Sequence, residues 1–225
     1  MGLCTHNPPA GRPSQPSPFS GVYEDSDPFF SLDNRTVYFN SRRPITGTTP
    51  REDGDLWSVS YSRNGWGQPV HLGAGPNSAA DEFYASMDRH GTLYFASNRD
   101  GGQWDIYRSS PGRDGRFGPA EKLGAEVNTP DYWEYNPEIS PNGNTLLFAS
   151  LNRPDSLGWG DLYVSRAHRG AFAQAQNLGP CVNSAADEYH PTMLWDEEQL
   201  FFVRNVIEDE FWIPDFFSVP LSLED

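Results

Sequence analysis

The sequence has few cysteines, few basic residues and no long apolar run, and each shortage excludes a class of protein. Two cysteines, Cys4 and Cys181, make no disulfide framework, and Cys181 is expected to pack as a small hydrophobic residue. Only 16 Lys and Arg stand against 31 Asp and Glu, giving a formal charge of −15. This balance argues against nucleic-acid binding, because basic side chains must neutralise the phosphates. No apolar run is long enough to span a membrane.

The first twenty residues are rich in Pro and Ser and contain no charged start followed by an apolar stretch, so no signal peptide is visible. Cys4 is followed by "THNPPAGRPSQPSPFSG", which is typical of the tether after a lipid-modified cysteine and suggests a lipid anchor at Cys4. We therefore expect residues 1–20 to be a tether or a closing strand.

Helical patterning is also missing, since no stretch carries a sustained 3.6-residue apolar period and the chain has 21 Gly and 20 Pro. Instead, four short apolar runs recur: "TVYFNS", "TLYFAS", "TLLFAS" and "QLFFVR". The aligned phenylalanines are 56, 53 and 54 residues apart, at Phe39, Phe95, Phe148 and Phe202. A repeat of this length predicts an array of equal structural units.

Each unit reads as strand, turn, strand, loop, strand, turn, strand, with period-2 patterning and aromatic or β-branched residues. The pattern predicts an all-β fold, a β-propeller of four four-stranded antiparallel blades at about 21–73, 79–124, 132–179 and 186–225. The last unit lacks its fourth strand, so we expect the N-terminal segment to complete it, although its prolines suit an edge strand poorly. The alternatives are a fragment of a larger ring, or a half-ring completed by a second chain.

The units resemble the WD40-like PD40 repeat family of TolB-type propellers. The resemblance rests on "YASMDRHGTLYFASNRDGGQWDIYRSS" and on "NPEISPNGNTLLFAS" with "GDLYVSR", and it covers roughly residues 21–225. It implies a propeller scaffold for binding, a periplasmic or outer-membrane-associated location, and no single reaction. The fourth unit departs from it, because "MLWDEEQLFF" lacks the Ser-Pro-Asp-Gly turn. Without a visible signal peptide, a cytoplasmic location also stays open.

One acid recurs at the start of every innermost strand, twice within the phrase "NSAADE". These acids are Asp25, Glu82, Glu134 and Glu188. They could line a polar channel mouth that binds a ligand. Alternatively, they could form a ring of ion pairs between blades, with no ligand, because an arginine recurs after each second strand. These arginines are Arg43, Arg99, Arg153 and Arg204.

Two residues after each acid, the side chain differs between units: Asp27, Tyr84, Asn136 and His190. Strand alternation predicts that each lies on the same side as its acid, and we expect this set to be the more informative about a ligand. A divalent cation, Ca²⁺ above all, could be held by Asp25, Asp27, Glu188 and His190, because carboxylates and imidazole suit such ions. A lone histidine is otherwise a satisfied polar residue.

Two further sets recur on the loops. The aspartates that open each third strand predict structural caps with arginine partners: Asp55, Asp105, Asp161 and Asp215. Tryptophans on the same face could form an aromatic platform for a sugar, or could simply pack over blade edges: Trp104, Trp133, Trp159 and Trp212.

Two functions follow from these patterns. The first is a non-enzymatic propeller that binds a protein or glycan on its acidic, Trp-bearing loop face. The second is a small glycan-processing hydrolase or lyase, or a metal-dependent enzyme, with Glu188 and His190 as catalytic candidates. No GxSxG turn, P-loop or CxxC site is present. His190 is the only base outside the repeat pattern, which favours binding.

Overall fold

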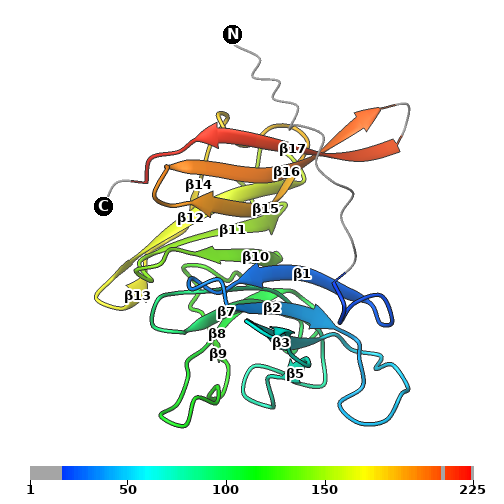
Figure 1. Cartoon of the computed structure of the whole chain (residues 1–225). Coiled ribbons are helices and arrows are strands. Elements are labelled where there is room, and N and C mark those ends of the chain that lie inside the picture. Colours follow the sequence, from blue (N-terminus) through cyan, green and yellow to red (C-terminus); the bar gives the residue numbers. More distant parts are fainter. Residues whose placement is uncertain (1–16, 209–210, 224–225) are drawn as a thin grey trace.

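The computed structural model describes residues 17–208 and 211–223 and is built from four antiparallel sheets (Figure 1). The first sheet contains β1 (Asp25–Phe30), β2 (Thr36–Ser41), β3 (Asp55–Ser62), β4 (Gly65–Trp66) and β5 (Val70–His71). The second contains β6 (Glu82–Met87), β7 (Leu93–Ser97), β8 (Asp105–Ser109) and β9 (Glu121–Lys122). The prediction of an all-β propeller with four blades is confirmed.

The third sheet contains β10 (Glu134–Ile139), β11 (Thr145–Leu151), β12 (Gly160–His168), β13 (Ala171–Phe172) and β14 (Gln176–Asn177). The fourth contains β15 (Asp187–Leu194), β16 (Gln199–Glu208) and β17 (Phe211–Pro220). Within the described residues, no helix has the length and hydropathy needed to cross a membrane.

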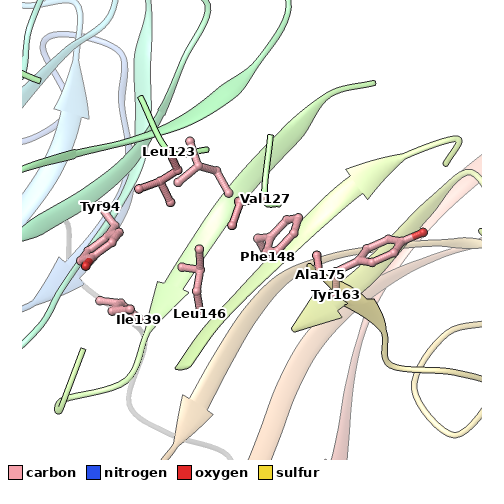
Figure 2. Packing of buried hydrophobic residues seen from close by; sticks show 9 residues of the cluster. Tyr94, Leu123, Val127, Ile139, Leu146, Phe148, Tyr163 and Ala175 are labelled. Atoms are coloured by element: carbon pink, nitrogen blue, oxygen red, sulfur yellow. The ribbon is translucent and has the colours of Figure 1, made fainter. Parts of the chain in front are cut away.

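The hydrophobic core lies between the blades, where facing sheets pack side chain against side chain. Figure 2 shows the contact between the second and third blades, with Tyr94 and Leu123 on one side and Leu146, Phe148 and Tyr163 on the other. The repeated phenylalanine faces the preceding blade at each such contact, as Phe95 and Phe202 also do. The residues that repeat in the sequence therefore form equivalent contacts between neighbouring blades.

Every innermost strand carries a β-bulge at the same place. The register shifts between Ser26 and Phe29 in β1, and equivalently in β6, β10 and β15. The bulged residues have positive φ angles of 50–58°: Asp27, Tyr84, Asn136 and His190. A bulge interrupts strict side-chain alternation, so the prediction that these residues share a side with their acids is wrong.

The fourth blade differs from the others at its outer edge. In the first three blades a short strand pairs with the third strand, and an asparagine side chain bonds the backbone of a buried residue such as Leu162. Phe216 stands at the position of Leu162 but is 83% exposed, whereas Leu162 is 0% exposed. No described residue pairs with the outer edge of β17.

The predicted closure by residues 1–20 falls mostly on residues 1–16, outside the described residues, and stays a prediction. Ser17–Ser20 lie against the first blade, where Phe19 packs on Phe39 and Trp66. Cys181 does not pack as expected: it is exposed on the linker before the fourth blade. Its neighbour Val182 occupies the core position instead.

Candidate functional site

The four repeated acids are held in buried ion pairs. The pairs are Asp25–Arg43 at 2.7 Å, Glu82–Arg99 at 2.9 Å, Glu134–Arg153 at 2.7 Å and Glu188–Arg204 at 2.5 Å. Each pair joins the first strand of a blade to the second strand of the same blade. The prediction that these pairs form between blades is therefore wrong. The three glutamates are 0% exposed and are fully engaged in the scaffold.

Each pair also fixes the linker that enters its blade. Arg153 donates to the carbonyl of Val127, and Glu134 accepts bonds from the backbone and hydroxyl of Thr129. The guanidinium of Arg153 lies 5.3 Å from the ring centre of Phe148 and 4.6 Å from that of Tyr163. Charge pairing, linker bonding and cation–π contact therefore converge on one arginine per blade.

The variable set, in contrast, meets at the central channel. Tyr84 and His190 stack edge to face with ring centres 4.9 Å apart, and Asn136 Nδ2 lies 3.3 Å from His190 Nδ1. Asp27 Oδ1 lies 3.8 Å from His190 Nε2. All four residues line a cavity of about 80 Å³ that is bounded by the first strand of every blade. The first strand of each of the four blades thus contributes one member of this set to the cavity.

Burial shapes the chemistry of this cluster. It lowers the pKa of His190, an effect that Asp27 opposes, and it raises the pKa of Asp27. It also raises the pKa of Tyr84 to about 12, with a further contribution from Asp27. Asp27 and His190 are therefore both shifted toward their neutral forms.

The arrangement considered for a divalent cation does not form. In residues 17–208 and 211–223, no group of three or more His, Cys, Asp or Glu side chains is placed to hold a metal ion. Asp25 and Glu188 are each bound to the arginine of their own blade, and only Asp27 and His190 approach one another. We therefore assign no metal to the channel.

The aspartates that open the third strands are structural, but their partners vary. Asp55 lies 2.8 Å from Arg51, whereas Asp105 binds Lys122 at 2.6 Å and Asp161 accepts from Asn177 at 2.6 Å. Asp215 accepts from the backbone of Phe216. The expected arginine partner is thus found in the first blade, and the short fourth strand supplies the partner in the next two.

Three of the four predicted tryptophans gather in one pocket of about 470 Å³. Its walls are aromatic and come from the second and third blades: Phe83, Tyr84, Trp104, Trp133, Tyr135 and Trp159. Trp133 and Trp159 are 41% and 62% exposed. Trp212 is placed only by its backbone, in β17; its side chain lies outside the described residues.

Backbone bonds to the next strand or linker hold the tryptophan loops in place. The carbonyl of Trp104 accepts from the amide of Glu134 at 2.8 Å, and the amide of Trp159 donates to the carbonyl of Ala186 at 2.9 Å. Ala186 belongs to the second "NSAADE" phrase, and Glu134 begins β10. The linkers therefore position the aromatic residues as well as the strands.

The polar wall of the pocket, Asp187 and Asn205, was not predicted as part of the aromatic site; Asp187 was considered only beside Glu188 and His190 for a metal. Asp187 has the place in the second "NSAADE" that Asp81 has in the first, yet the two differ. Asp81 Oδ1 accepts from the amide of Gly54, whereas Asp187 Oδ1 is buried with no hydrogen-bond partner among the described residues. Gly160, the equivalent of Gly54, is already part of β12 and pairs with Leu151.

Gly158 allows this close approach between a tryptophan loop and a linker. A Cβ at Gly158 would lie 1.9 Å from the carbonyl oxygen of Ala186 and 2.6 Å from that of Ser184. Gly158→Ala is therefore expected to push the loop away, break the Trp159–Ala186 bond and destabilise the protein by about 1–3 kcal/mol. Chemical denaturation followed by tryptophan fluorescence measures both effects.

Gly67→Ala is the matched control, because its Cβ would lie 3.4 Å from the nearest backbone oxygen, that of Ser60. It should leave stability and fluorescence nearly unchanged. Equal behaviour of the two variants would show that the loop does not depend on contact with the linker.

The sequence matches no protein-family model and no curated protein. Among solved structures, it is similar to one assigned as TolB from Agrobacterium tumefaciens, with 17% identity, a TM-score of 0.57, and coverage of 87% of this chain and 60% of that one. The chain has a TolB-like β-propeller fold. The chain is also similar to a GH43_12 protein from a capybara gut metagenome, with 15% identity and a TM-score of 0.58. It covers 42% of that structure, with 92% of its own residues aligned, so it spans less than two thirds of either neighbour.

Proposed function

We propose that this TolB-like propeller is a non-catalytic module that binds a glycan in the aromatic pocket. The observation that carries the proposal is the convergence of Trp104, Trp133 and Trp159 beside Asp187 and Asn205 in a pocket of about 470 Å³. Indole faces stack on the C–H faces of sugars, and a few polar groups then fix orientation. The volume is within the range of small-ligand sites.

A binding role is favoured over hydrolysis by the number of carboxylates. Glycoside hydrolysis generally needs two carboxyl groups set at a defined separation across the scissile bond. Among the described residues that line the pocket, Asp187 is the only acid. Glu188 is tied to Ser184 and Arg204, and His190 faces the channel cavity. The likeness to the GH43_12 protein is one of fold, and its activity is not carried over.

Glycan binding should depend on individual tryptophans. Trp104→Ala and Trp159→Ala are each expected to weaken binding by about 30-fold or more, the loss of roughly 2 kcal/mol typical of a central tryptophan anchor. A glycan array identifies the ligand, and titration calorimetry measures the change in Kd.

The control is Tyr61→Ala, which removes a half-exposed aromatic residue of the first blade that lies outside the pocket. It should leave the Kd unchanged. Thermal denaturation checks that the Trp159 variant folds, as expected for a side chain that is 62% exposed. If no glycan binds, or if the tryptophan variants bind as the control does, the proposed function is wrong.

The location of the protein is part of the same proposal. Its resemblance to TolB-type propellers supports a periplasmic or outer-membrane-associated location, where extracellular glycans are accessible. Fractionation of native cells tests this expectation, and recovery in the cytoplasmic fraction would overturn it.

A further inference from the structure

The described lining of the aromatic pocket contains an acidic side chain and no basic one. Among its described lining residues none is Lys, Arg or His, and the polar ones are Asp187 and Asn205. The arginines of neighbouring strands are already engaged, Arg153 with Glu134 and Arg204 with Glu188. The whole chain carries a formal charge of −15. The field inside the pocket is therefore negative.

Asp187 is an acid with no cationic partner within ion-pair distance in the described residues. Its Oδ2 accepts from Asn205 Nδ2 at 2.9 Å, and its Oδ1 has no described hydrogen-bond partner. Burial raises the pKa of Asp187, and the neighbouring charge of Glu188 adds to the rise. The equivalent residue Asp81 has both carboxylate oxygens engaged, with the amide of Gly54 and the side chain of Asn98, so Asp187 stands apart from the repeat pattern. A buried carboxylate of this kind is stabilised by an incoming positive charge.

The aromatic walls of the pocket also favour a positively charged ligand. The face of an aromatic ring carries negative electrostatic potential, and a cation over an indole is the strongest such contact. Trp104, Trp133 and Trp159 all line the pocket. A neutral sugar also uses the indole faces, and its hydroxyl groups can donate to the carboxylate, but it brings no positive charge to balance that of Asp187.

We propose that the pocket selects glycans whose sugar units carry a free, protonated amine, through cation–π contact with its indoles and the charge of Asp187. This inference rests on the proposed function and names the ligand class of the same site. The amine is expected to lie over the tryptophan faces on the side of Asp187, with the ring hydroxyl groups toward Asn205.

The test compares two ligands that differ at the amine, which is protonated in one and is an uncharged acetamide in the other. Titration calorimetry is run with glucosamine oligomers and with N-acetylglucosamine oligomers of the same length, at a pH where the free amine is protonated. The free-amine oligomers should bind at least about tenfold more tightly, and added salt should reduce that preference because it screens charge.

Asp187→Asn should abolish the preference while leaving the affinity for the acetylated oligomers unchanged. Asp196→Asn is the matched control: it removes the same charge from an exposed turn between β15 and β16 and should keep the preference. The salt dependence of the unaltered protein gives a readout that needs no variant.

The outcomes separate the two claims. Equal affinity for both oligomers, or tighter binding of the acetylated ones, overturns the amine inference and leaves glycan binding standing. A preference that survives in Asp187→Asn at unchanged strength overturns the role of this carboxylate. Failure of every glycan in the panel to bind overturns the proposed function as well.

Discussion

Replacing Arg153 with alanine is expected to lower the free energy of unfolding by about 3–5 kcal/mol, the cost of removing one partner of a buried ion pair. The side chains of Arg153 and Glu134 are 5% and 0% exposed, so Glu134 would keep a buried carboxylate without its counter-ion. The linker would lose the bond to the carbonyl of Val127, and Tyr163 would lose its cation–π contact. Urea denaturation monitored by circular dichroism measures the loss.

Arg108→Ala is the control for this experiment. Arg108 pairs with Glu121 at 3.2 Å, but the two side chains are 37% and 67% exposed, so the pair should contribute less than about 1 kcal/mol. A loss in Arg153→Ala no larger than that in Arg108→Ala would mean that the buried pairs do not hold the blades to their linkers. The repeated acids would then need another explanation.

Glu138→Gln is expected to stabilise the protein above neutral pH. Glu138 lines the channel cavity, and burial raises its pKa to about 8, although Trp195 Nε1 donates to its Oε1 at 3.3 Å. Because the folded state holds this proton more tightly than the unfolded state, the contribution is complete below pH of about 4.5 and is lost as pH rises through about 8. The loss is at most about 5 kcal/mol.

Glutamine keeps the oxygen that accepts from Trp195 and from the amide of Met193, and it has no proton to lose. The variant should therefore match the native chain at low pH and become more stable as pH approaches 8. Denaturation at a series of pH values gives the difference between the two curves, and Glu121→Gln, an exposed site, should give none. Parallel curves for Glu138→Gln would show that this carboxyl titrates as an ordinary exposed one.

Much of the fold could be predicted from the sequence, because repeated motifs at equal spacing indicate repeated structural units. The spacing of Phe39, Phe95, Phe148 and Phe202 predicted equal blades, and the structure shows these phenylalanines packing toward the preceding blade or, for Phe39, toward Phe19. Regular acids and arginines predicted ion pairs in the same way. Their pairing within each blade was not predicted, because sequence spacing does not say which of two facing loops an arginine meets.

The site was predictable in part. The tryptophan loops were expected on one face, and Trp104, Trp133 and Trp159 do meet there. Phe83 and Tyr135 were missed, because aromatic residues in strands usually indicate core. The place of Asp187 in this pocket was missed because the residue belongs to a repeated phrase, and only the comparison of its contacts with those of Asp81 distinguishes it.

The sequence by itself determined the strands and the four repeated units, since these depend on local patterning and on the spacing of equivalent residues. It left open whether the repeated acids are scaffold or site. Only the tertiary structure decided what the non-repeated residues do. The bulges turn Asp27 and His190 into the channel, and the early start of β12 leaves Asp187 Oδ1 unpartnered beside the indoles. Sequence spacing does not show these features, because the blades bring together residues that are far apart along the chain, such as Asp27 and His190.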